Sequence, residues 1–462
     1  MGTNASIPKG TRDFAPNVVR KRTYILDTLK NILEKYGFQP LETPAIENLE
    51  TLTGKYGEDG DKLIFKILNN GLDNPEKGHT VQEEWQKVLQ GKSSRAITER
   101  ALRYDLTVPF ARFVAMNYGQ LVFPFKRYQI QNVWRADRPQ KGRYREFCQC
   151  DIDVAGSASL FNEVELLQIY GEAFTRLAFP DFKLVVNNRK VLAALAAVAG
   201  CGPRLSDLTT ALDKIDKIGL DKVTEELKGK DFTGGQIEVI KKYLSIEGSN
   251  EKRLLAAREL LAASDTGLQG LTELEFVLNF PSAKFKDKIV FEPALVRGLN
   301  YYTGTIFEAK PPAAVKIGST GGGGRYDDLT SIFGVPNIQG VGISFGVDRI
   351  YDVMDELKLF PANLEVGTRV LFFNLGEKES ERSFELMQRM RAMNISCELF
   401  HENCRFDKQF KYAEKKNIPS VVIIGSKELE AQTCVVKNLA SGKQEVIAQN
   451  SIESYFSGGK PL

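Results

Sequence analysis

Histidine is almost absent from this chain, which has only His79 and His401 among its 462 residues. Neither histidine lies in a recognisable motif, so the sequence nearly excludes a catalytic triad or other chemistry that needs a histidine base. None of the six cysteines forms a C-x-x-C pair, so we expect no zinc site and reduced thiols, as in cytosolic proteins. If the chain is an enzyme, it works by positioning its substrates and by charge.

Long hydrophobic runs are also missing. No stretch of about 18 apolar residues occurs and the N-terminus lacks the apolar core of a signal peptide, so we expect a cytoplasmic protein without a membrane span. The net charge is only +3, which indicates that any contact with nucleic acid is local. The P-loop motif is absent. The length suggests about three domains.

Cationic charge is nevertheless concentrated between Lys126 and Phe147. The segment continues to Asp153 with a period of two, so one face of an extended strand would carry Arg143, Arg145, Phe147, Gln149, Asp151 and Asp153. At about 3.4 Å per residue, Arg145 to Asp153 spans roughly 27 Å. This change from cations to carboxylates suits an elongated ligand with a phosphate at one end. A salt-bridged surface hairpin is the alternative that this segment alone leaves open.

Leu295–Glu308 brings Arg297 close to the tandem tyrosines Tyr301 and Tyr302. A buried arginine beside hydroxyl groups can stabilise the charge that develops on a phosphoryl group. A core tyrosine pair with an interface arginine fits this pattern equally well.

Two glycine-rich segments follow. The run Gly321–Gly324 is either a flexible link or a backbone that passes close beneath a ligand. In Gly340–Ile350 a strand runs into a helix with Arg349 in its first turn, and helix N-termini favour anions. Strand-to-helix turns with glycine are common, so this pattern is weak alone.

Periodicity predicts the elements that carry these segments. We expect a helix over 17–36, two strands within 125–153 joined by a turn at 138–142, and a second helix over 160–179. The polar stretch 69–94 indicates a surface insertion. Thr107 is expected to cap the helix that starts at Val108.

The sequence pattern changes in the later part of the chain. Residues 187–287 keep helical spacing without a catalytic motif, which predicts a helical insertion. Beyond a linker at 361–367, strands alternate with helices, which predicts a small α/β domain with a mainly parallel sheet.

In chain order, these segments resemble the histidyl-tRNA synthetase family of the class II aminoacyl-tRNA synthetases. Val133–Asp153 is similar to motif 2 of the class, and Gly340–Ile350 is similar to motif 3. Four further segments match sequences of the family: Pro8–Phe14, Tyr104–Arg112, Leu295–Glu308 and Gly321–Leu329. The resemblance covers nearly the whole chain.

The resemblance implies a pocket for L-histidine. Asp105 and Thr107 match the pair that holds the α-amino group, whereas Asp153 and Tyr302 match the groups that bond the imidazole nitrogens. An amino acid without imidazole would leave those two groups unpaired, which can discriminate by on the order of 10⁴. The full set implied for histidine is Asp105, Leu106, Thr107, Arg135, Gln149, Asp153, Arg297, Tyr301, Tyr302 and Tyr326.

It also implies a site for ATP, accompanied by Mg²⁺ and without a protein-bound metal. Arg135 matches the motif 2 arginine at the α-phosphate, and Arg297 matches the catalytic arginine of the family. The residues implied for ATP are Arg135, Arg143, Arg145, Phe147 and Arg349.

The fold implied is α/β, with an α+β catalytic core that has a class II antiparallel sheet flanked by helices. The expected domains are the first part of the catalytic core (1–186), a helical insertion (187–287), the second part of the core (288–361) and an anticodon-binding domain (367–462). The N-terminal helix and the strand near Pro44 match motif 1, which implies a homodimer. The other implied partner is a histidine-accepting tRNA.

Two other functions fit parts of these patterns. One is a catalytically silent relative that binds uncharged tRNA or histidine as a sensor. Such relatives usually lose signature residues, whereas Arg135, Arg297 and Arg349 are present here. The other is a synthetase for a different amino acid, which the pair Asp153 and Tyr302 argues against.

Overall fold

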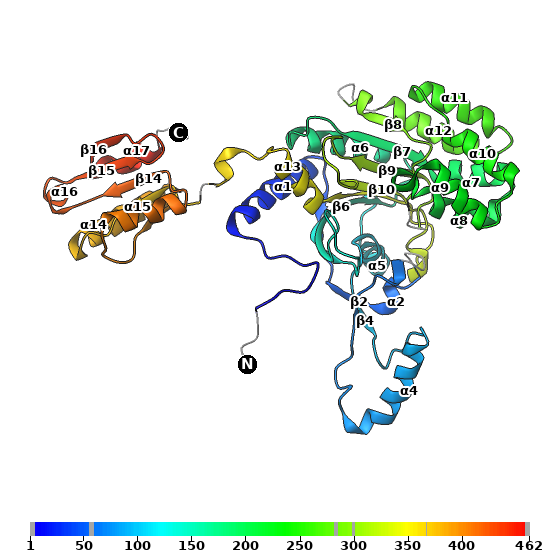
Figure 1. Ribbon diagram of the computed structural model, residues 1–462, viewed down its shortest axis with the longest axis horizontal. Helices are drawn as coiled ribbons and strands as arrows, with labels where there is room; N and C mark the ends of the chain where they lie inside the picture. The colour runs from blue at the N-terminus through cyan, green and yellow to red at the C-terminus, as the bar shows by residue number, and fades with distance from the viewer. Residues whose placement is uncertain (1–4, 55–59, 281–284, 298–300, 366, 458–462) are drawn as a thin grey trace. The chain divides into compact units, whose positions relative to one another are not determined.

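A computed structural model describes residues 5–54, 60–280, 285–297, 301–365 and 367–457. The chain divides into two compact units (Figure 1). The first comprises Met1–Ala15 and Arg22–Leu359, and the second comprises Pro16–Lys21 and Phe360–Leu462. Among the described residues, no helix has the length and apolar character needed to cross a membrane.

An eight-stranded sheet forms the centre of the first unit, in the order β1-β5-β6-β11-β10-β9-β7-β8. Its strands pair antiparallel except at the two edges, where β1 with β5 and β7 with β8 are parallel. The predicted antiparallel sheet with flanking helices is therefore confirmed. The strands are β1 (Gln39–Pro40), β5 (Phe125–Trp134), β6 (Glu146–Ala155), β7 (Lys183–Asn188), β8 (Ile289–Phe291), β9 (Thr305–Lys310), β10 (Gly321–Arg325) and β11 (Gly340–Gly346).

Helices pack on this sheet through apolar faces. On α6, Tyr170 contacts Phe345 of β11 at a ring distance of 4.7 Å, and its hydroxyl donates to Ser344 O at 2.9 Å. Around the sheet lie α1 (Pro16–Lys35), α2 (Leu49–Leu52), α5 (Thr107–Asn117), α6 (Phe161–Arg176) and α13 (Val347–Glu356). The helices predicted over 17–36 and 160–179 are confirmed as α1 and α6.

The β5–β6 hairpin confirms the prediction made from the period of two. The register places Arg127 opposite Asp153, and the isolated bridge between Gln140 and Arg143 closes the predicted turn. The even-numbered side chains from Cys148 to Val154 are buried in the core. Strand β6 therefore has an apolar face in the core and a polar face that carries Gln149, Asp151 and Asp153.

The start of α5 differs from the prediction. Thr107 is the first residue of the helix and does not cap it. Instead, Asp105 Oδ1 accepts a hydrogen bond from Val108 N at 3.1 Å. A carboxylate at this position also compensates the positive end of the helix dipole, which explains why it replaces the threonine.

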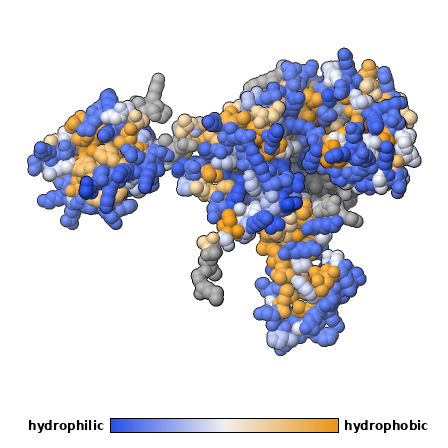
Figure 2. All heavy atoms as spheres, viewed as in Figure 1, coloured by the Kyte–Doolittle hydropathy of each residue, from blue (hydrophilic) through white to orange (hydrophobic). Residues whose placement is uncertain are grey.

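Residues 69–94 form an arm that projects from the first unit (Figure 1). At its base, β2 (Ile46–Asn48), β4 (Arg100–Leu102) and β3 (Lys66–Ile67) form a small sheet, and the arm contains α4 (Gly78–Leu89). Hydrophobic surface is visible on this arm in Figure 2, and its exposed apolar side chains include Trp85 and Leu89. The predicted surface insertion is confirmed.

A group of helices connects β7 to β8. The prediction of a helical segment in this part of the chain is confirmed, and α12 packs against β7 and β8. The helices are α7 (Arg189–Val198), α8 (Leu205–Leu212), α9 (Ile215–Gly229), α10 (Gly234–Leu244), α11 (Asn250–Leu260) and α12 (Asp265–Asn279).

The second unit has a five-stranded sheet in the order β13-β12-β14-β15-β16. The prediction of a mainly parallel sheet is only half right, because β15 and β16 form an antiparallel hairpin beside the parallel strands β13, β12 and β14. The elements are β12 (Val370–Phe372), α14 (Glu377–Ala392), β13 (Cys397–Leu399), α15 (Phe406–Lys415), β14 (Ser420–Ile423), α16 (Ser426–Glu430), β15 (Thr433–Asn438), β16 (Gln444–Ala448) and α17 (Ile452–Ser457).

Candidate active site

Two adjoining cavities lie over the centre of the large sheet. The larger has a volume of about 1040 Å³ and the smaller about 200 Å³. Their walls share residues from β6, β10, β11, the start of α13, the β5–β6 connection and the loop that carries Arg297, so the cavities form one elongated cleft. The residues lining both are Arg135, Asp137, Arg143, Gln149, Arg297, Gly322, Ser344 and Arg349.

Glycines in β10 and β11 let this cleft reach the sheet. A Cβ atom on Gly322 would lie 2.7 Å from the guanidinium of Arg297, and one on Gly342 would lie 2.0 Å from Asp153 Oδ1. Both distances are shorter than a van der Waals contact, so only glycine leaves room for these two side chains. Of the two interpretations of Gly321–Gly324, the structure therefore favours the close backbone approach over the flexible link.

The carboxylate of Asp153 is held at the bottom of the larger cavity. Its Oδ1 accepts from the Tyr326 hydroxyl at 2.5 Å, and its Oδ2 lies 2.7 Å from Arg127 Nη2 in an ion pair whose angles are outside hydrogen-bond geometry. Arg127 is fully buried and lies over the ring of Phe110 at 4.4 Å. Burial raises the pKa of Asp153, although the charge of Arg127 opposes the shift. Oδ2 retains the capacity to accept a hydrogen bond from a ligand.

Tyrosines form one wall of the same cavity. The rings of Tyr301 and Tyr302 meet edge to face at 4.8 Å, and the Tyr301 hydroxyl donates to Asp105 Oδ2 at 3.4 Å. Asp105 and Thr107 also line the cavity. Apart from Leu106, the predicted histidine-pocket residues are thus brought together by the β5–β6 hairpin, the start of α5, and the matching segments 295–308 and 321–329. Residues 298–300 of the first of these segments lie outside the described residues.

Arginines dominate the end of the cleft that includes the smaller cavity. Arg135 Nε donates to Tyr104 O at 3.1 Å, and Arg349 donates to Gly142 O at 2.7 Å and to Ser319 O at 2.8 Å. Burial lowers the pKa of Arg349, and so do three neighbouring cations: Arg143, Arg135 and Arg297. Cations that repel one another across a shared cleft are stabilised by a polyanionic ligand.

Two predicted residues, Leu106 and Arg145, lie outside both cavities. The side chain of Leu106 is fully buried, and its carbonyl oxygen accepts from Arg127 Nη2 at 3.1 Å. Arg145 donates from Nε to Asp137 O at 3.1 Å and from Nη1 to Lys9 O at 3.4 Å, and its backbone N–H donates to Gly10 O at 2.9 Å. The N-terminal segment therefore holds Arg145 beside Asp137, which lines both cavities.

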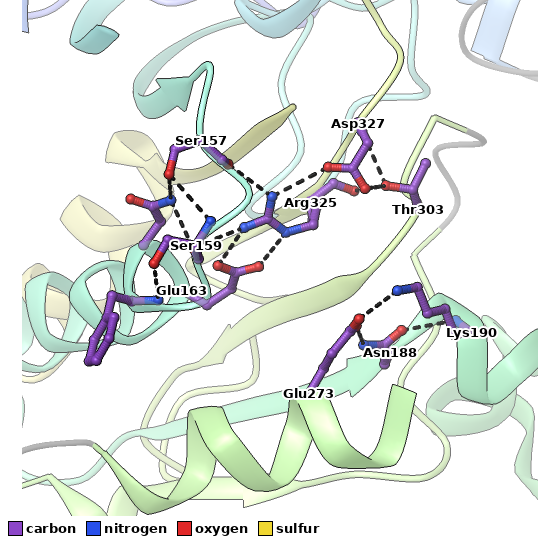
Figure 3. A network of polar contacts seen from close by, with 11 residues as sticks. Ser157, Ser159, Glu163, Asn188, Lys190, Glu273, Thr303, Arg325 and Asp327 are labelled. Atoms are coloured by element: carbon purple, nitrogen blue, oxygen red, sulfur yellow. Dashed lines mark hydrogen bonds and ion pairs between the residues drawn. The ribbon is translucent and has the colours of Figure 1, made fainter. Parts of the chain in front are cut away.

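A buried ion pair between Arg325 and Glu163 joins β10 to α6 (Figure 3). Arg325, at the end of β10, makes two bonds to Glu163 of α6, at 2.6 and 2.7 Å, and also reaches Asp327 at 3.3 Å. Glu163 is fully buried and Arg325 is nearly so. Because Tyr326 follows Arg325 directly, this pair anchors the strand end that presents Tyr326 to Asp153.

Comparisons with known proteins identify the family. Residues 72–350 match the family model described as histidyl-tRNA synthetase, and residues 369–458 match the anticodon binding domain. The histidine–tRNA ligase of Bacteroides fragilis is 48% identical over 98% of this chain and 99% of its own length. The chain belongs to the histidyl-tRNA synthetase family. The histidine–tRNA ligase of Flavobacterium johnsoniae is 46% identical over 96% of this chain and 97% of its own length.

A solved structure agrees with this assignment. The crystal structure of histidyl-tRNA synthetase from Nostoc sp. PCC 7120 has a TM-score of 0.79, with 29% identity, and the match covers 99% of this chain and all of that one. The chain is thus an aminoacyl-tRNA ligase of the histidyl-tRNA synthetase family.

Two residues that contact the pocket, Arg127 and Ser344, were not predicted from the sequence. Asp151 was predicted on the polar face of the strand but without a role of its own. A signal existed for Arg127, because Arg127 and Asp153 lie equally far on the two sides of Gln140, at the centre of the predicted turn. Ser344 gave no such signal, because its neighbours come from a distant strand.

Proposed function

We propose that the larger cavity binds L-histidine and that the smaller one binds ATP. The observation that carries this proposal is the position of Arg297 and Arg135, which line both cavities and therefore lie where the two substrates would meet. The carboxylate end of the cleft suits the imidazole and α-ammonium groups. Its arginine end suits a triphosphate, since the planar guanidinium bonds phosphate oxygens in pairs.

Within the larger cavity, Asp153 would accept from one imidazole nitrogen and Tyr302 would bond the other. Asp105, Thr107 and Gln149 would hold the α-ammonium group, with Tyr301 and Tyr326 as walls. At the other end, Phe147 would stack on adenine, Arg143 and Arg349 would bind phosphates, and Arg145 would clamp the nucleotide from the edge of the cleft. We give Leu106 no side-chain contact with the substrate, because its side chain is buried in the core.

The first reaction needs no protein nucleophile. A carboxylate oxygen of histidine bonds to the α-phosphorus of ATP, and the bond from that phosphorus to the bridging oxygen of pyrophosphate breaks. Arg135 and Arg297 would stabilise the negative charge on the α-phosphoryl oxygens in the transition state. The terminal ribose hydroxyl of tRNA then attacks the histidyl carbonyl, and AMP leaves.

Mg²⁺ would enter with ATP. Among the described residues, no group of three or more histidine, cysteine, aspartate or glutamate side chains is arranged to hold a metal ion. Mg²⁺ is commonly bound by one or two carboxylates together with substrate phosphates, so the phosphates would supply most of its ligands. The ion would neutralise part of the phosphate charge.

We further propose a cytoplasmic homodimer with four functional regions. Residues 1–186 and 288–361 would form the catalytic core, 187–287 an insertion, and 367–462 the part that binds the tRNA anticodon. The match of 369–458 to anticodon binding domains supports the last assignment. The dimer rests on the likeness of α1 and the following strand to motif 1, and light scattering of the purified chain would measure it.

The decisive experiment for the catalytic roles is histidine-dependent ATP–pyrophosphate exchange with Arg297→Ala. Removing the cation at the junction should lower kcat by on the order of 10²–10³, comparable to losing a charge-stabilising donor. The thermal unfolding temperature serves as the control for folding. A folded variant with near-normal exchange would contradict the catalytic role of Arg297.

A further inference from the structure

Three polar side chains connect β6 to β11 at the wall of the larger cavity. The register places Ser344 opposite Asp151. The Gln149 amide donates from Nε2 to Ser344 Oγ at 2.8 Å, and the Ser344 hydroxyl lies beside the Asp151 carboxylate, whose pKa it lowers. All three residues line the larger cavity. Ser344 therefore lies between the Gln149 amide and the Asp151 carboxylate, and we call these three side chains the relay.

A carboxylate on the far side of Ser344 fixes the orientation of the Gln149 amide. An ionised carboxylate only accepts hydrogen bonds, so the Ser344 proton points to Asp151 and the Ser344 oxygen must accept from Gln149. The amide NH₂ group is thereby turned toward Ser344. Its carbonyl oxygen, Oε1, is buried and has no hydrogen-bond partner within the described part of the chain. A buried carbonyl without a donor is unfavourable, so this atom favours a ligand that donates.

We propose that Asp151 and Ser344 are positioning residues that hold Gln149 Oε1 toward the α-ammonium group of the amino-acid substrate. This inference rests on the proposed function, since it requires an amino acid in the larger cavity. An ammonium group has three donors and no acceptor. It would bond Oε1 in the observed orientation and would be repelled by the NH₂ group of a flipped amide.

The charge on Asp151 controls the relay. Burial raises the pKa of Asp151 to about 7, with Arg127 opposing the shift and the charge of Asp153 adding to it. The charged and titratable groups that interact with Asp151 come from several elements: Arg127 on β5, Asp153, Cys148 and Cys150 on β6, Arg103 and Asp105 before α5, Tyr170 on α6, and Tyr302.

Protonation of Asp151 would reverse the hydrogen bonds. A neutral carboxyl can donate to Ser344 Oγ, and the serine proton is then free to point toward Gln149. The amide would turn its carbonyl oxygen to Ser344 and present NH₂ to the ammonium group. Substrate affinity through this contact would therefore be present above the pKa of Asp151 and lost as the pH falls through it.

The test measures KM for histidine and for ATP with Ser344→Ala and Asp151→Asn in the full-length chain. We expect each variant to raise KM for histidine about tenfold at pH 8, the effect of one hydrogen bond to a charged group, while KM for ATP changes less than twofold. Ser245→Ala is the matched control, because Ser245 is exposed at the end of α10 and its hydroxyl donates to Lys242 O of the same helix.

Two readouts separate positioning from a general loss of structure. The first is the KM for histidine of Asp151→Asn divided by that of the wild type. This ratio should fall from about ten at pH 8 toward one at pH 6. Protonation of the substrate affects both proteins equally and so cancels in the ratio. Inhibition by imidazolepropionate, which lacks the α-ammonium group, should be equal in all three proteins. Weaker inhibition in the variants, or a ratio independent of pH, would overturn the relay.

The outcome for wild type tests the proposed function separately. If the unmodified chain shows no histidine-dependent exchange, the proposed function itself is wrong. If the wild type is active and both variants keep its KM for histidine, the proposed function stands and the relay is overturned.

Discussion

Gly322→Ala offers the sharpest test of how the sheet positions Arg297, the arginine that we propose to be catalytic. The added Cβ would lie 2.7 Å from Cζ, Nη1 and Nη2 of Arg297. Carbon contacts are comfortable at about 3.5–4.0 Å, so the guanidinium must move by about 1 Å. The atoms it meets belong to the end of a flexible side chain, so the clash is relieved by movement of Arg297 rather than by unfolding.

A displacement of this size is enough to disturb catalysis. Moving a catalytic group by about 1 Å can lower a rate by about 10²-fold. We therefore expect Gly322→Ala to reduce kcat for ATP–pyrophosphate exchange about 100-fold. The free energy of unfolding should change by less than about 3 kcal/mol, the usual upper range for overpacking.

Gly119→Ala is the matched control, because a Cβ there meets no atom within 4 Å. It should leave exchange unchanged. A Gly322→Ala protein with wild-type kcat would refute the reasoning, because Arg297 could then move without consequence. A loss of activity that is fully explained by a smaller fraction of folded protein would also refute the reasoning.

Three further changes have defined expectations. Glu163→Gln leaves Arg325 without its buried counter-charge and should lower the free energy of unfolding by about 3–5 kcal/mol, measured in urea. Asp151 has a pKa raised to about 7, so between pH 4 and pH 7 the native state binds a proton that the unfolded state has lost. The free energy of unfolding should therefore fall by up to about 4 kcal/mol as the pH rises from 4 to 7. Asp151→Asn should flatten this decline. Gly10→Ala places a Cβ 2.8 Å from Arg145 Cγ at a φ of +91°, and should raise KM for ATP severalfold without changing KM for histidine.

The local sequence pattern was sufficient to predict much of the candidate site. The period of two in β6 correctly separated the core face from the face with Gln149 and Asp153, because alternation is a property of the extended chain itself. The family signatures then supplied Arg297 and Tyr302, and the structure brings both to the cavity that Asp153 lines.

Contacts between distant segments could not be predicted in the same way. Ser344 meets Asp151 only because β11 pairs with β6 in one register, and no local feature near Ser344 specifies that register. The antiparallel hairpin β15–β16 was missed for a similar reason, since strand alternation does not reveal strand direction. The predicted cap of α5 was also wrong. Asp105 and Thr107 both suit a helix start, and only the backbone conformation decides between them.

The central claim is that the carboxylate end of the cleft selects histidine. Aminoacylation of tRNA by the purified chain, measured with histidine, proline and threonine in parallel, tests it most directly. We expect charging with histidine and discrimination of on the order of 10⁴ or more against the other two, because neither can satisfy Asp153 and Tyr302. Comparable charging with proline or threonine, or no charging with any of the three, would contradict the account.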